Sequence, residues 1–174
     1  MKEILRFALI LGMICAIASG LLAIVNNVTK GRILAQAEIE LNSSLKEVIP
    51  DADTFLPVKD GEEILYYKAF DAQKNTIGFA FKSSKKGYSS FVETLAGIDR
   101  KGQILNIKVI NQVETPGLGS RVTEDSFTGQ FKQQYASLLT DVQAITGATI
   151  SSRAVIEGVK EKASRIQERI KNEQ

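Results

Sequence analysis

The stretch EILYYKAFDAQKNTIGFAFKS, from Glu63 to Ser83, decides the fold of this chain. Aromatic and β-branched residues, which favour strands, are concentrated at its two ends, Glu63 to Phe70 and Thr76 to Ser83. Between them, Asp71 to Asn75 supplies residues typical of a turn. The pattern predicts a β-hairpin.

A second hairpin is predicted immediately downstream of the first. FVETLAGI, from Phe91 to Ile98, and ILNIKVIN, from Ile104 to Asn111, are the two strand segments. Asp99 to Gly102 provides the turn that joins them. Two consecutive hairpins predict an antiparallel sheet in the middle of the chain.

Helical periods flank the strands on both sides. One predicted helix precedes Pro50, which ends it, a second runs from Phe127 to Leu139, and a third closes the chain. Strands grouped between helices indicate an α+β fold with an antiparallel sheet and flanking helices. The recurring apolar positions are Ile33, Leu34, Ala37, Leu41, Leu45 and Val48, then Phe127, Phe131, Tyr135, Leu138 and Leu139, and finally Ile156, Val159, Ala163, Ile166 and Ile170.

The N-terminal part of the chain contains an uncharged run, FALILGMICAIASGLLAIVNNVT, from Phe7 to Thr29. About 20 apolar residues suffice for a helix to cross the hydrocarbon core of a bilayer, so the run predicts one transmembrane helix. A signal peptide cleaved after Ala18 is the alternative, but the apolar run continues to Val25. The chain is therefore divided into a short segment 1–6, a transmembrane helix 7–29, a connecting amphipathic helix 30–49 and one domain over 50–174.

Composition excludes several classes of chemistry. The 174 residues include no histidine and one cysteine, which excludes histidine-ligated haem, thiolate-held iron–sulfur clusters and an internal disulfide. No metal site is predicted. The net charge of +2 gives no support for nucleic-acid binding. Any redox activity would therefore depend on an organic cofactor.

The stretch ITGATISSR, from Ile145 to Arg153, gathers four hydroxyl side chains where the last predicted helix begins. Ser151 or Ser152 could be the N-cap residue of that helix. Alternatively, a helix N-terminus with free N–H groups and a nearby glycine can bind phosphate. Physical chemistry leaves both interpretations open at this point.

A second motif, ETPGLG from Glu114 to Gly119, places a proline and two glycines around one leucine. ETPGLG, TGATISS and the stretch GYSSFVETLAGID from Gly87 to Asp99 accompany an N-terminal span in this chain. With these motifs the chain resembles the G subunit of the Rnf (Rsx) electron transport complex. It is more distantly similar to the C subunit of the sodium-pumping NADH:quinone reductase.

The resemblance implies that 50–174 is an FMN-binding domain carrying one covalent FMN. The phosphate would be esterified to the hydroxyl of Thr149, and Arg153 would offset part of its charge. Glu114 to Gly119 would lie against the flavin. The other residues expected to bind the cofactor are Thr146, Gly147, Ala148, Ser151, Ser152, Glu114, Thr115, Leu118 and Gly119.

The resemblance also implies a biological context. The protein would be an electron-transfer subunit of an ion-translocating ferredoxin:NAD oxidoreductase in the bacterial inner membrane, with no catalytic turnover of its own. Its partners would be the other subunits of the complex, the membrane and a maturation enzyme, a flavin transferase that uses FAD and Mg²⁺. The soluble domain would lie on the periplasmic side, which the flanking charges alone do not decide.

Two alternatives remain compatible with the residues. The domain could bind FMN or another phosphorylated ligand without a covalent bond. It could also be a structural or assembly subunit whose hydroxyl groups only cap a helix.

Overall fold

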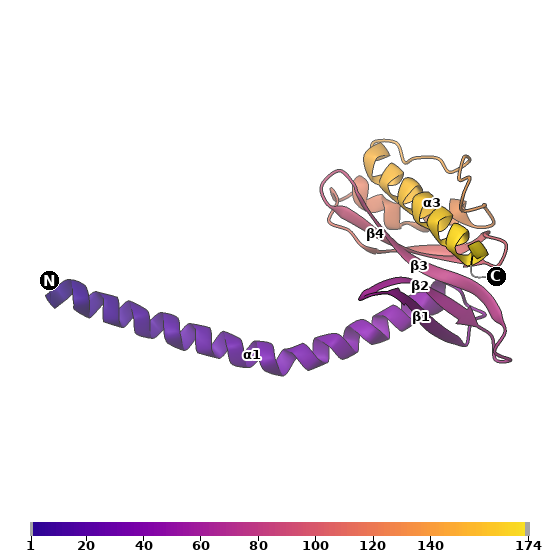
Figure 1. The fold of residues 1–174 in the computed structure, drawn as a ribbon. Helices are drawn as coiled ribbons and strands as arrows, with labels where there is room; N and C mark the ends of the chain where they lie inside the picture. The colour runs from indigo at the N-terminus through magenta and orange to yellow at the C-terminus, as the bar shows by residue number, and fades with distance from the viewer. Residues whose placement is uncertain (1, 173–174) are drawn as a thin grey trace. The chain divides into compact units, whose positions relative to one another are not determined.

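The computed structural model describes residues 2–172, and the chain forms two compact units, one up to residue 42 and one from residue 43. The first unit is part of a single helix, α1 (Lys2–Val48), drawn in indigo to violet in Figure 1. The second unit contains the last turn of α1, a sheet of five strands, short helical turns and the long helix α3 (Thr149–Asn172).

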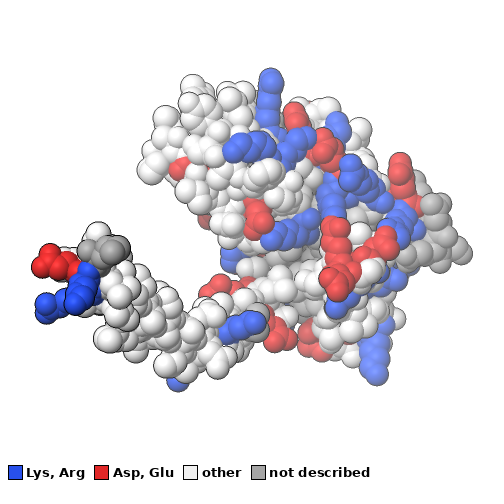
Figure 2. Space-filling view, turned by 60° about the vertical axis from the view of Figure 1, so that its left-hand side comes forward, with Lys and Arg blue, Asp and Glu red and all other residues white. Residues whose placement is uncertain are grey.

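α1 is long and apolar enough to cross a membrane, with a mean hydropathy of 2.6 in its apolar part. Its 47 residues rise about 70 Å at ~1.5 Å per residue, which is more than twice the thickness of the hydrocarbon core. One unbroken helix therefore covers both the predicted span 7–29 and the predicted connecting helix 30–49. Figure 2 shows α1 as mostly white, whereas Lys, Arg, Asp and Glu are intermingled on the visible face of the second unit.

The end of α1 agrees with the prediction from Pro50, because the helix stops at Val48. Its apolar face has two different environments. Leu45 and Val48 are buried in the second unit, whereas Ile33 is 59% exposed. The last turn of α1 thus contributes to the core of the second unit.

Both predicted hairpins are confirmed, and the sheet has a fifth strand that the sequence did not predict. Neighbouring strands are all antiparallel, in the order β1-β2-β3-β4-β5. The unpredicted strand, β1, contains Pro57 and lies at an edge, where a missing N–H donor is tolerated. The bounds are β1 Thr54–Asp60, β2 Glu63–Phe70, β3 Thr76–Lys86, β4 Phe91–Asp99 and β5 Ile104–Asn111.

Helical segments pack on both faces of the sheet. α3 packs across β3 and β4, as Figure 1 shows, and buries Val155, Val159 and Ala163 in the main core. Ala96 and Ile98 of β4 lie in the same core cluster as these residues of α3. Successive residues of a strand point to opposite faces, so Gly97, between them, faces away from α3. A Cβ atom on Gly97 would lie 2.5 Å from the carbonyl oxygen of Val48, so the last turn of α1 packs closely on this second face.

The helix predicted from Phe127 to Leu139 is wrong. The segment contains only the single turn α2 (Asp125–Thr128) and the 3-10 turn η2 (Gly129–Phe131), and its backbone then pairs with the start of β5. The N–H of Gln133 donates to the carbonyl of Ile104 at 2.8 Å, and the N–H of Ile104 donates to the carbonyl of Gln134 at 2.8 Å. Pairing with the sheet edge thus replaces the helical hydrogen bonds. Phe127 and Phe131 nevertheless remain buried as an edge-to-face pair whose ring centroids are 5.4 Å apart.

Candidate functional site

A cavity of about 530 Å³ brings the two sequence motifs together at the N-terminus of α3. Its size is that of a small-molecule or cofactor site. The ETPGLG and TGAT segments, which are far apart in the chain, form most of its wall. The lining residues are Tyr88, Glu114, Thr115, Leu118, Gly119, Gly147, Ala148, Thr149, Ile150 and Ser151.

The N-terminus of α3 has free hydrogen-bond donors that line this cavity. The helix begins at Thr149, and its first backbone bond runs from the N–H of Ser152 to the carbonyl of Ala148, at 2.9 Å. Within residues 2–172, the N–H groups of Thr149, Ile150 and Ser151 have no acceptor. Such free N–H groups, together with the helix dipole, favour an anion.

The TGAT segment has the backbone shape that this arrangement requires. Gly147 has a φ of 83°, in the left-handed region that favours glycine, and the N–H of Ala148 then bonds to the carbonyl of Ile145 at 2.9 Å. The side chain of Thr149 is exposed, and its hydroxyl makes no hydrogen bond to any described residue. Thr146 is also exposed but does not line the cavity. Of the two threonines, Thr149 alone is placed on the cavity wall.

The two serines do not cap α3, so the prediction of an N-cap at Ser151 or Ser152 is wrong. Both lie inside the first turn and are buried. Ser152 Oγ donates to the carbonyl of Ala148 at 2.9 Å and accepts from the N–H of Ile145 at 3.0 Å. These two bonds fix the backbone of the TGAT segment relative to the first turn of α3. Ser151 Oγ donates to Glu114 Oε2 at 2.6 Å and so links the two motifs directly.

Glu114 is the only charged residue among those that line the cavity, and it is 6% exposed. Its carboxylate accepts hydrogen bonds from the backbone N–H groups of Tyr88, Ser89 and Ser90, at 2.9–3.1 Å, and from Ser151. Burial raises the pKa of Glu114, but these hydrogen bonds together outweigh it, so the pKa lies below its ordinary value. The group is therefore a buried carboxylate held in its ionised form.

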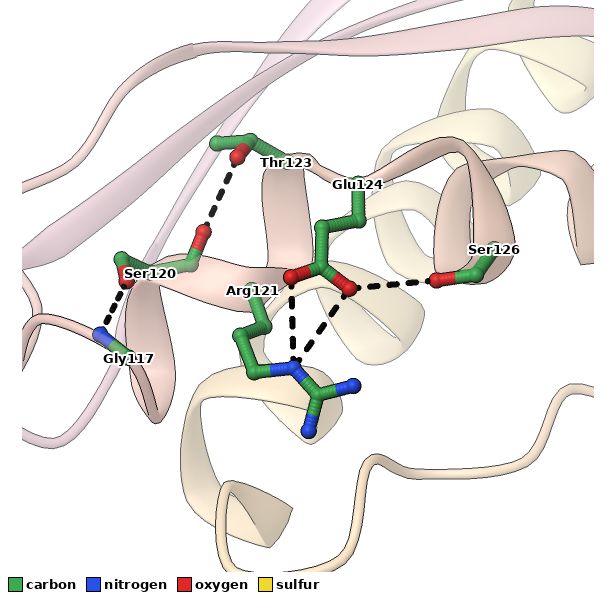
Figure 3. A network of polar contacts seen from close by, with 6 residues as sticks. All are labelled: Gly117, Ser120, Arg121, Thr123, Glu124 and Ser126. Carbon is green, nitrogen blue, oxygen red and sulfur yellow. Dashed lines mark hydrogen bonds and ion pairs between the residues drawn. The ribbon is translucent and has the colours of Figure 1, made fainter.

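The ETPGLG loop is shaped by its glycines and by the helical turn that follows. Gly117 has a φ of 73°, and its N–H donates to Ser120 Oγ at 3.0 Å in the turn η1 (Gly119–Thr123). Figure 3 shows this bond beside the contacts of Glu124 with Arg121 and Ser126. Leu118, at the tip of the loop, lines the cavity and is 47% exposed.

The sequence did not identify every residue at the site. Tyr88 and Ile150 line the cavity and are 68% and 55% exposed. The signal for Tyr88 was the Gly-Tyr-Ser-Ser turn between two strands, whereas Ile150 resembles any apolar helix residue. Arg153, which was expected to offset phosphate charge, is exposed, does not line the cavity and forms no ion pair with the described residues. Among residues 2–172, no cluster of acidic, cysteine or histidine side chains could hold a metal.

Comparisons with known proteins cover both units. An FMN-binding domain family matches residues 87–164, and an RnfG N-terminal region matches residues 1–48. The chain is 33% identical to the G subunit of the proton-translocating ferredoxin:NAD(+) oxidoreductase complex of Clostridium ljungdahlii, over 87% of this chain and 85% of that protein. It is 35% identical to the G subunit of the ion-translocating oxidoreductase complex of Methanosarcina acetivorans, over 91% and 92%. Among solved structures, NqrC of Shewanella oneidensis is similar with a TM-score of 0.49 and 18% identity, over 65% of this chain and 66% of that one.

Proposed function

This chain belongs to the family of G subunits of Rnf-type ion-translocating ferredoxin:NAD oxidoreductase complexes, and we propose that it transfers electrons there through FMN esterified to Thr149. The observation that carries the proposal is the position of Thr149. Its hydroxyl makes no hydrogen bond to the described residues and lies on the wall of a cofactor-sized cavity. The three backbone N–H groups beside it also have no acceptor among the described residues.

The residues of the cavity fit a flavin phosphate. The free N–H groups of Thr149, Ile150 and Ser151 can donate to phosphate oxygens, and the dipole of α3 favours their negative charge. Ser152 holds the segment before the helix in place. Tyr88, Leu118 and Ile150 supply exposed apolar surface that can cover a planar ring. When bound, FMN supplies one-electron and two-electron transfer.

Among the described residues, the site offers no group that could activate Thr149 for its own modification. Glu114 is ionised, but both of its oxygens already accept hydrogen bonds from the protein. A threonine hydroxyl needs a base or a metal to act as a nucleophile. A separate flavin transferase would therefore join Thr149 Oγ1 to the FMN phosphorus of FAD, with cleavage of the pyrophosphate bond and release of AMP.

The proposal extends to the membrane context. α1 would anchor the protein as a single-pass subunit beside the other membrane and peripheral subunits of the complex, with residues 43–174 outside the cytoplasm as the family resemblance implies. A cysteine introduced at the exposed Lys46 should react with an impermeant maleimide in intact cells, whereas Cys15 in the span should not. Labelling of Lys46→Cys only after lysis would contradict the proposed side.

Substitution of Thr149 tests the attachment. After co-expression with a flavin transferase, Thr149→Ala should lose the flavin fluorescence that survives denaturing electrophoresis, and Thr149→Ser should keep part of it. Thr146→Ala is the matched control, since Thr146 lies off the cavity wall, and it should retain most of the label. Peptide mass mapping of 145–153 should place the mass increment on Thr149. A full covalent load on Thr149→Ala would refute the assignment, and a flavin that leaves every variant on denaturation would indicate non-covalent binding.

A further inference from the structure

The carboxylate of Glu114 is saturated by donors from the protein itself. Oε1 accepts from the N–H groups of Ser89 and Ser90, at 3.1 and 2.9 Å. Oε2 accepts from the N–H of Tyr88 at 3.1 Å and from Ser151 Oγ at 2.6 Å. A carboxylate has about four acceptor sites, so no capacity remains for a ligand. Glu114 therefore has no free acceptor site for a hydrogen bond to a ligand in the cavity.

Two glycines make room for this carboxylate. A Cβ atom on Gly87 would lie 2.7 Å from Glu114 Oε1, and one on Gly119 would lie 2.9 Å from Glu114 Oε2. Neither distance is tolerated between a methyl group and a carboxylate oxygen. The backbone at Gly87 and at Gly119 thus packs directly against the carboxylate of Glu114.

The donors and the acid come from three separate parts of the chain. The loop 87–90 joins β3 to β4, Glu114 opens the loop 114–119 after β5, and Ser151 lies in the first turn of α3. The same three segments supply most of the cavity wall, including Tyr88, Leu118 and Thr149. The side chain of Glu114 therefore connects the three segments that line the cavity.

We propose that Glu114 is a positioning residue that joins these three segments into one site and places a negative charge in its wall. This inference rests on the proposed function, since the site it organises is the FMN site. The charge opposes the addition of electrons to a flavin held in the same cavity. Glu114 would therefore lower the reduction potential of the flavin as well as hold Thr149 in position.

A neutral isostere cannot replace the carboxylate. Glutamine at 114 keeps one acceptor oxygen but introduces an NH₂ group, which would face either the N–H of Tyr88 or those of Ser89 and Ser90. At least one backbone donor of the loop would then lose its acceptor. Glu114→Gln removes the charge and part of the hydrogen bonding, whereas Ser151→Ala removes one hydrogen bond and keeps the charge.

The test compares Glu114→Gln and Ser151→Ala with Glu124→Gln in the full-length protein in detergent. Glu124 is a matched control, because its partners Arg121 and Ser126, drawn in Figure 3, do not line the cavity. Three quantities are measured: amide hydrogen exchange before modification, the initial rate of flavin attachment by a transferase, and the midpoint potential of the attached flavin.

Glu114→Gln should accelerate amide exchange about tenfold or more at the N–H groups of residues 88–90, because their hydrogen bonds to a charged carboxylate are lost. The N–H of Ser152, the first hydrogen-bonded amide of α3, should also exchange faster, since the contact of the neighbouring Ser151 with residue 114 is weakened. Flavin attachment should slow by a similar factor, and the midpoint potential of the remaining flavoprotein should rise. Ser151→Ala should accelerate exchange at the N–H of Ser152 and slow attachment, with little change in potential. Glu124→Gln should match the wild type in all three measurements.

The possible outcomes separate this inference from the proposed function. If the wild type accepts no flavin, the proposed function fails, and the exchange data alone decide whether Glu114 couples the three segments. If the wild type is flavinylated and Glu114→Gln keeps its exchange pattern, attachment rate and potential, the inference is refuted. Should Glu114→Gln not fold, unchanged exchange and attachment in Ser151→Ala would overturn it.

Discussion

Gly119→Ala should disrupt the site by steric contact alone. The φ of Gly119 lies outside the left-handed region, so alanine is compatible with its backbone. Its new Cβ atom, however, would lie 2.7 Å from Ser151 Oγ, 2.8 Å from Glu114 Cβ and 2.9 Å from Glu114 Oε2. Because ordinary contacts begin near 3.4 Å, the loop or the carboxylate must move by several tenths of an ångström. Overpacking of this kind costs ~1–3 kcal/mol.

The cost should appear in both stability and flavin attachment. At about 2–4 °C per kcal/mol for a chain of this size, the thermal midpoint of Gly119→Ala should fall by roughly 2–12 °C. The initial rate of attachment by a flavin transferase should also fall, because the bond between Ser151 and Glu114 is displaced. Gly129→Ala is the matched control: its φ is −62° and no described atom lies within 4 Å of its Cβ position, so it should be neutral or slightly stabilising. A wild-type midpoint and attachment rate in Gly119→Ala would refute the steric argument.

Three further predictions concern the rest of the molecule. Gly97→Ala should destabilise the second unit by ~1–3 kcal/mol in thermal unfolding, since its Cβ would lie 2.5 Å from the carbonyl oxygen of Val48. A loss of stability smaller than that of a surface substitution would count against close packing between Gly97 and the last turn of α1. Because the folded-state pKa of Glu114 is depressed, its ionisation stabilises the fold above the ordinary glutamate pKa, and this contribution is lost as the pH falls through the folded-state value. The wild type should therefore lose more stability than Glu114→Gln in unfolding experiments between neutral and strongly acidic pH, and parallel losses would contradict this. The native protein should stay in the membrane through a carbonate wash, and recovery of a mature form beginning at Ser19 would show that α1 is cleaved.

Local patterns in the sequence were sufficient where the structure is decided by neighbouring residues. The helix over 7–29 follows from the length of its uncharged run, the strands on either side of Asp71 to Asn75 follow from their aromatic and β-branched residues, and the helix end follows from Pro50. The same patterns misled where distant contacts compete with them. The helical period from Phe127 to Leu139 was overridden by backbone pairing with β5, and the edge strand β1 was missed because Pro57 obscures its strand pattern.

At the candidate site, the sequence by itself determined which residues are present, and the tertiary structure decided what each one contacts. The motifs marked Glu114, Thr149 and their neighbours, but only the fold shows that Ser151 bonds to Glu114, 37 residues earlier, and caps nothing. The physical reason is that the placement of the ETPGLG loop beside the N-terminus of α3 and the saturation of a buried carboxylate depend on where separate loops pack. Those contacts form between segments far apart in the chain, and no local period encodes them.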